Sequence, residues 1–182
     1  MLRIEELEAA LPTMTRWRAG SPRRVDWAAL EGGLGTALPA DYRVLAEAYP
    51  TLVIDDFLSV ALPAPGFETN FVAGRRYSSE ILRDLWEIDE TEGYAPYPEP
   101  GGVLCWGESY SGDQLYWKMN SPDPDAWPVV VFGRNGDWSE FEMGVVEFLA
   151  ATYRRTIDIP GMPANFPSEH PQVMGHDRRS AT

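Results

Sequence analysis

The sequence predicts a single α+β domain with a central, mostly antiparallel sheet flanked by helices. Helical periodicity dominates the first half of the chain, short β-rich runs follow between residues 103 and 141, and one more helical pattern comes after them. Elements grouped in this order favour α+β over the regular alternation of a parallel α/β fold. The chain has 182 residues, 44% of them apolar, which is enough to build one hydrophobic core.

Three helices are expected in the N-terminal third. Each has apolar residues three or four positions apart, which places them on one helical face. Asp26 can cap the second helix, and Pro39 suits the first turn of the third. The expected helices are 3–11, ending near Pro12; 27–31, ending at Gly32-Gly33; and 39–49, ending at Pro50.

Two short apolar runs, 52–54 and 57–62, predict strands on either side of Asp55-Asp56. Ser78 can cap a fourth helix. The expected buried stripe of that helix consists of Ile81, Leu82, Leu85 and Ile88. The segment 89–102 is rich in Pro, Gly and acidic residues, and we therefore expect an exposed loop there.

Four further strands are expected before a last helix over 143–153. Asn135-Gly136 is a strong signal for a hairpin between the last two of these strands. The expected strands are 103–107, 114–118, 129–132 and 138–141. We divide the chain into an N-terminal helix and lead-in (1–24), an α+β domain (25–153) and a Pro-rich tail (154–182). The tail has no periodicity, and we expect it to be loosely held.

The compartment is expected to be the cytoplasm. The single cysteine, Cys105, cannot form an internal disulfide, which favours a reducing environment. Acidic residues interrupt the short apolar pattern of the N-terminus, unlike a signal peptide. No stretch of the sequence approaches the ~20 apolar residues that a membrane helix requires.

Charge is the strongest global signal in the sequence. The formal net charge is −13, from 15 basic and 28 acidic residues. Residues 84–117 contain eight acidic residues and no Lys or Arg. Such a surface repels nucleic acid and anionic membranes and attracts basic proteins, although acidic charge can also serve solubility alone. We therefore expect a basic protein partner.

The sequence predicts no metal site and no cofactor. Both histidines, His170 and His176, lie in the tail, far from Cys105. The segment 120–125 has oxygen ligands at alternating positions but lacks the central Gly and closing Glu of a calcium loop. Cys105 itself lies within an apolar strand pattern, where a cysteine usually serves packing.

Glu108 and Asp113 are the only enzymatic signal. They flank the loop between two expected strands, where a hairpin could bring them together as an acid/base pair. Trp106 and Trp117 could then stack on a sugar ring. The plainer interpretation is a hairpin loop in which Asp113 bonds turn backbone.

Several motifs between residues 25 and 153 resemble those of one family. They are Trp27, Leu30-Glu31, Leu34-Gly35, Leu38-Pro39-x-Asp41-Tyr42-x-x-Leu45 and Tyr49, then Gly112-Asp113-Gln114-Leu115-Tyr116-Trp117, Asp125-x-Trp127-Pro128-Val129-Val130-Val131, Trp138-x-x-Phe141 and Val146-Glu147-Phe148-Leu149. Their order and spacing resemble the SUKH superfamily, which includes fungal cell-wall-synthesis regulators and bacterial immunity proteins. Pro50 departs from the Gly usual in that family. The resemblance implies a non-enzymatic α+β domain, and bacterial members commonly neutralise a cognate toxin, often a nuclease.

We therefore expect an immunity-type protein that binds a basic toxin through acidic residues, with an exposed Tyr or Trp as anchor. The expected partner-binding residues are Glu87, Asp89, Glu90, Glu92, Glu108 and Asp113. Two alternatives stay open. One is a regulatory or scaffold domain for cellular proteins, and the other is a hydrolase that uses Glu108 and Asp113.

Overall fold

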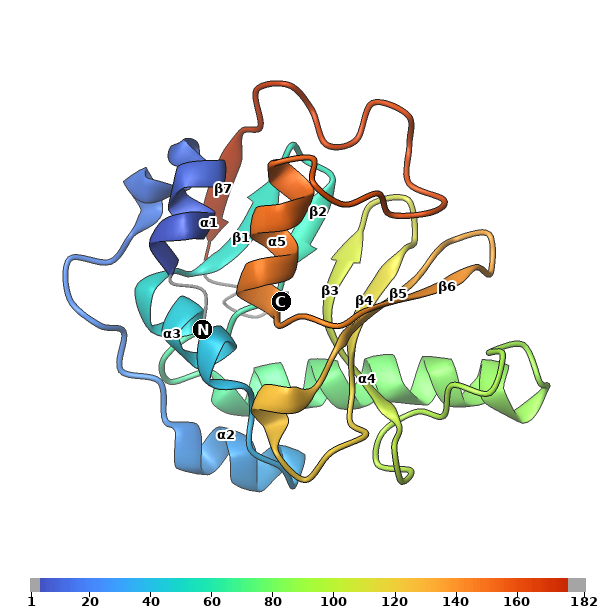
Figure 1. Ribbon diagram of the computed structural model, residues 1–182. Helices are drawn as coiled ribbons and strands as arrows, with labels where there is room; N and C mark the ends of the chain where they lie inside the picture. The colour runs from blue at the N-terminus through green and yellow to red at the C-terminus, as the bar shows by residue number, and fades with distance from the viewer. Residues whose placement is uncertain (1–3, 177–182) are drawn as a thin grey trace.

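Seven strands form one antiparallel sheet at the centre of the structure, a computed structural model that describes residues 4–176 (Figure 1). The order across the sheet is β6-β5-β4-β3-β2-β1-β7. The strands are β1 (Thr51–Ile54), β2 (Leu58–Val60), β3 (Val103–Ser109), β4 (Gln114–Lys118), β5 (Val129–Phe132), β6 (Trp138–Phe141) and β7 (Val173–His176). The sheet, with helices on both faces, confirms the predicted α+β class.

The five α-helices lie close to the predicted positions, with two differences. They are α1 (Ile4–Ala10), α2 (Trp27–Leu34), α3 (Ala40–Ala48), α4 (Glu68–Glu87) and α5 (Val145–Tyr153), with short 3-10 turns η1 (Pro12–Trp17) and η2 (Pro124–Ala126). One difference is that α2 runs through Gly32-Gly33, where we expected it to end, and stops at Leu34 with the left-handed Gly35 as its C-cap. The other is that α4 begins ten residues before Ser78. Its first half buries Glu68 and Arg75, so the apolar periodicity that marks a helix in sequence is missing there.

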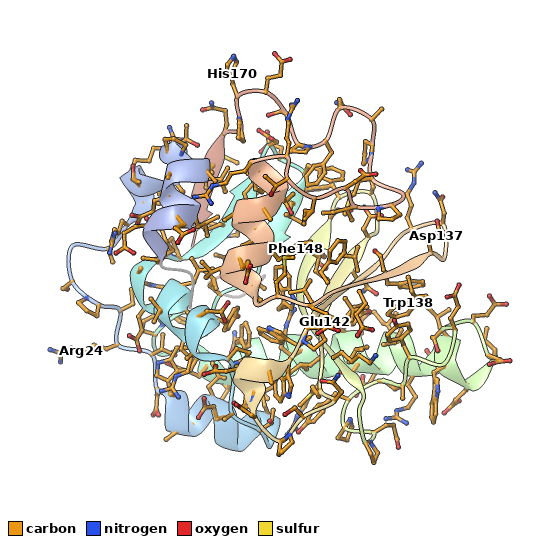
Figure 2. The ribbon with its side chains drawn as sticks, viewed as in Figure 1. Arg24, Asp137, Trp138, Glu142, Phe148 and His170 are labelled. Atoms are coloured by element: carbon orange, nitrogen blue, oxygen red, sulfur yellow. The ribbon has the colours of Figure 1, made fainter. Side chains whose placement is uncertain are left out.

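Helices cover the two faces of the sheet unequally. The larger core lies between the sheet and the helices α1, α3 and α5, and it contains the fully buried Trp106 and Trp117. Figure 2 shows Phe148 of α5 directed at the sheet, whereas Arg24 and His170 point outward. A smaller cluster on the other face joins Leu82 of α4 to four strand residues, which are Val103, Cys105, Tyr116 and Val130. Burial raises the pKa of the Cys105 thiol, consistent with a packing role.

The C-terminal segment differs from the prediction. We expected residues 154–182 to be loosely held, but β7 pairs with β1 along its whole length, and Val173 is fully buried. Arg16 and Trp17 of η1 also donate hydrogen bonds to the Val173 carbonyl at 2.6 and 2.7 Å. A four-residue strand whose partner lies far away in the sequence has no local pattern to reveal it. Residues 177–182 of the predicted tail lie outside the described residues.

The docking of β7 can be tested with two neighbouring residues of that strand. Val173→Ala should lower the free energy of unfolding by about 2 kcal/mol, because it leaves a cavity in the larger core. Met174→Ala, on the exposed side of the same strand, should change it by no more than about 0.5 kcal/mol. Chemical denaturation of both variants provides the measurement. Equally small effects would contradict the buried position of Val173.

Candidate protein-binding surface

Acidic side chains gather where α4 ends. Asp84, Glu87, Asp89, Glu90 and Glu92 are all exposed, and the last turn of α4 contains no basic residue. None of these five carboxylates forms an ion pair within the part of the chain that the structure describes. Figure 1 shows the end of α4 and the following loop projecting past the β6 edge of the sheet. The structure therefore brings together four of the six predicted partner-binding residues.

The backbone holds this acidic group in a defined geometry. The Asp89 amide donates to the Trp86 carbonyl at 3.1 Å, and the Glu90 amide donates to the Leu85 carbonyl at 3.0 Å. These two bonds form a Schellman motif, which needs a left-handed residue and usually has Gly there. Here Asp89 takes that position with φ 64°, and Glu92 is also left-handed, with φ 51°. Both residues adopt a conformation that is uncommon for non-glycine residues.

The charges are unfavourable in the free protein. The C-terminus of a helix carries a partial negative charge, so carboxylates there lower stability. The neighbouring cation, Arg83, already bonds Glu99 at 2.9 Å and lies 5.9 Å from the Trp86 ring. The excess of acidic residues is visible in the sequence. Only their position at the C-terminal end of α4 explains why their charges lower the stability of the free protein.

Exposed apolar side chains lie on the same helix. Tyr77, Ile81 and Ile88 are 64%, 39% and 66% exposed, and the helical repeat places them on one outer face of α4. Our prediction that Ile81 and Ile88 are buried was wrong, because α4 turns its Val72–Arg75–Ser79–Leu82 side inward instead. We define the α4 surface as these three apolar residues together with Asp84, Glu87, Asp89, Glu90 and Glu92.

Glu108 and Asp113 lie apart from the α4 surface, in and beside the β3–β4 turn. Asp113 is only 1% exposed, so its predicted role as a partner contact was wrong. Its carboxylate accepts hydrogen bonds from the Ser109 hydroxyl and from the Arg134 amide. Asp113 thus joins two adjacent hairpins. The plainer interpretation, in which Asp113 bonds turn backbone, was correct. The backbone amide that it bonds, however, belongs to Arg134 in the neighbouring β5–β6 turn.

The arrangement expected for a sugar hydrolase is not formed. Trp106 and Trp117 are fully buried and cannot stack on a sugar ring. Asp113 is held in the hydrogen bonds of the two hairpins. Glu108 remains partly exposed on the sheet face.

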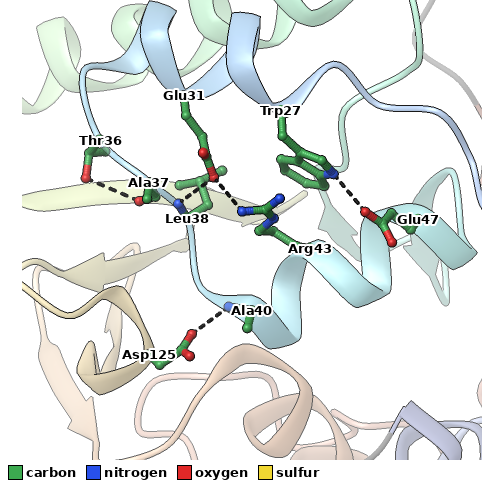
Figure 3. Close-up of polar contacts among 9 residues, drawn as sticks. All are labelled: Trp27, Glu31, Thr36, Ala37, Leu38, Ala40, Arg43, Glu47 and Asp125. Carbon is green, nitrogen blue, oxygen red and sulfur yellow. Dashed lines mark hydrogen bonds and ion pairs between the residues drawn. The ribbon is translucent and has the colours of Figure 1, made fainter.

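The segment 120–125 and many residues of the SUKH-like motifs act in folding. Asp125 accepts a hydrogen bond from the Ala40 amide at 2.6 Å, which ties η2 to the start of α3 (Figure 3). Glu31 accepts from the Leu38 amide and from Arg43, which joins α2 to α3 (Figure 3). Among the described residues, no group of His, Cys, Asp and Glu could hold a metal ion.

A hollow of about 460 Å³ lies at the N-terminus of α5 and has an acidic lining that includes Glu142 and Glu147. Its Asp41 carboxylate accepts the Val146 amide at 3.0 Å. Burial raises the pKa of Asp41, while the backbone hydrogen bonds oppose this rise. This carboxylate therefore holds α3 to α5.

Comparisons with protein-family models, with curated proteins and with solved structures give no match for this chain. No described helix combines the length and the apolar character needed to cross a membrane.

The structural role of Asp113 is testable. Asp113→Ala should lower the free energy of unfolding by about 2 kcal/mol, because the Ser109 hydroxyl and the Arg134 amide lose their acceptor. Asp158→Ala removes an exposed carboxylate elsewhere and should cost no more than about 0.5 kcal/mol. Urea denaturation compares the two. An Asp113 variant as stable as the control would return this residue to the list of binding candidates.

Proposed function

We propose that the protein is a non-catalytic binding domain that neutralises a basic toxin by binding it through the α4 surface. The observation that carries this proposal is the group of five exposed carboxylates at the negative end of a 20-residue helix, with no described basic partner. Each such charge costs the free protein about 0.3–1 kcal/mol at low ionic strength. A basic partner removes this cost on binding, so the arrangement favours association over isolated stability.

The apolar part of the α4 surface supports the same proposal. Binding energy at protein interfaces comes mainly from a few large side chains, surrounded by groups that set specificity and rate. Tyr77, Ile81 and Ile88 supply such anchors beside the acids. The acids would steer a basic protein toward them and raise the association rate.

A nuclease toxin fits these features because its nucleic-acid groove must be basic. An acidic surface docked over that groove excludes the substrate. The SUKH-like motifs point to the same role, since immunity proteins of that superfamily neutralise toxins by binding. The proposed compartment is the cytoplasm, where a nuclease would do its damage.

The direct test uses the product of a toxin gene encoded beside this gene. Co-expression should restore growth, and the purified proteins should associate at a rate that falls about tenfold or more between about 50 mM and about 300 mM salt. An association rate that does not depend on salt would contradict the electrostatic part of the proposal. Neighbouring genes with no toxin or secretion function would favour the regulatory or scaffold role instead.

Charge reversal should separate stability from binding. Glu87 and Glu90 are the best positions, because Asp89 and Glu92 have positive φ and substitution there would change the backbone as well. Glu87→Lys with Glu90→Lys should raise the free energy of unfolding by about 0.5–2 kcal/mol, since cations suit a helix C-terminus. The same variant should associate with the toxin about tenfold more slowly.

The matched control is Asp158→Lys with Glu169→Lys, which makes the same charge change at exposed positions outside α4. Surface plasmon resonance and thermal denaturation give the two readouts. Equal slowing by the control would mean that net charge matters and the position of the charge does not.

The apolar anchors call for a separate variant. Ile88→Ser should weaken toxin binding about tenfold or more, mainly through faster dissociation, while unfolding changes by no more than about 0.5 kcal/mol. Val44→Ser alters a similarly exposed apolar residue on α3 and should leave binding unchanged. An Ile88 variant that binds as tightly as the unaltered protein would remove this residue from the interface.

A further inference from the structure

A hollow of about 360 Å³ lies between α4, the end of α2 and the loop that follows α4. Arg76 and Arg83 are seven positions apart on α4, so they lie on one line along the helix, to the side of the outer face that carries Ile81 and Ile88. The lining combines basic and apolar side chains, among them Arg75, Arg76, Arg83, Leu34, Tyr97 and Pro98. A volume of this size and a mostly apolar lining with a few polar groups are typical of small-molecule sites.

Arg75 brings an unpaired charge to this hollow. It is only 7% exposed, yet it forms no ion pair with any described carboxylate. Its Nη1 donates to the Cys105 carbonyl, and its buried Nε has no hydrogen-bond partner among the described residues. A buried guanidinium is almost always paired with an anion, because burial removes the solvation of its charge. The chain has 28 acidic and 15 basic residues, so the missing counter-charge does not reflect a shortage of carboxylates.

Arg76 adds a second guanidinium that forms no ion pair among the described residues, not even with Glu80 four positions later. Its Nη2 donates to the Gly33 carbonyl at 2.6 Å. Burial raises the pKa of Tyr97, and the positive charge of Arg76 opposes this rise, which places the guanidinium near the phenol. The Tyr97 hydroxyl donates to the Leu34 carbonyl at 2.8 Å. These bonds hold both side chains in place and leave further donors of Arg76 for a ligand.

The charges around the hollow do not cancel. Arg83 donates to Glu99 at 2.9 Å, and Glu80 lies in the lining. Three arginines and these two carboxylates leave one positive charge over, although the whole protein has a formal net charge of −13. The hollow is thus a positive site on an acidic protein, and it attracts an anion that carries a single charge.

We propose that this hollow binds a small monocarboxylate that has an apolar body. A carboxylate supplies the counter-charge that Arg75 and Arg76 lack, and it can form two parallel hydrogen bonds with the flat fork of Arg76. Arg75 contributes through its charge, which acts more strongly in the weakly polar interior than in water. The apolar body can lie against Leu34, Pro98 and the Tyr97 ring. A phosphate monoester fits less well, because it carries nearly two negative charges.

The hollow and the α4 surface use different sides of the same helix. A carboxylate in the hollow would contact α2, α4 and the following loop without covering Ile81 or Ile88. The inference therefore goes beyond the proposed function and does not depend on it.

The test titrates the isotope-labelled full chain with 3-phenylpropionate at constant ionic strength and follows the amide resonances by NMR. The acid should shift the resonances of residues 34, 75–83 and 97. The neutral 3-phenylpropanamide, which has the same shape, should bind about tenfold more weakly or not at all. Acetate, which has the charge without the apolar body, should show a similar loss. Arg76→Gln should weaken binding of the acid about tenfold.

The matched control is Arg24→Gln, which makes the same charge change at an exposed position that points outward (Figure 2) and should leave the titration unchanged. Equal binding of the acid and the amide would overturn the inference, and so would an unaltered titration of Arg76→Gln. Tighter binding of phenyl phosphate than of the acid would overturn the assignment to a monocarboxylate. The comparison of acid with amide uses the unaltered protein, so it remains decisive if Arg76→Gln does not fold.

Discussion

The proposed binding surface depends on how α4 packs on the sheet. The helix is held by Leu82 in the smaller apolar cluster and by Arg75 bonded to the Cys105 carbonyl. Glu68 adds a third attachment at its first turn, where it accepts the Asp26 amide at 2.9 Å. These contacts fix the rotation of the helix. They turn Tyr77, Ile81 and Ile88 outward.

The polar contacts that hold α4 on the sheet have a further consequence. A helix that used Ile81, Leu85 and Ile88 as its buried stripe would hide these branched apolar groups and keep less apolar surface for a partner. Here part of the buried side is made of Glu68, Arg75 and Ser79, whereas Ile81 and Ile88 are exposed. The protein thereby exposes apolar area that could have stabilised its own core, an arrangement typical of binding surfaces.

The α4 surface would act on a partner before contact is made. Carboxylates at the end of α4 act over distance and raise the rate of encounter, and salt screens their effect.

The sequence by itself determined the α+β class, the position of nearly every element and the acidic stretch, because these follow from local periodicity, turn residues and composition. It singled out Glu87, Asp89, Glu90 and Glu92, which the structure shows exposed at the end of α4, yet it expected Asp113 to be exposed, although this residue is buried and bonds an amide 21 positions away. Only the tertiary structure decided β7, the exposed face of α4 and the hollow that α4 forms with Leu34 and Tyr97. Each of these arises from contacts between segments distant in the chain, which leave no local pattern for sequence reasoning to detect.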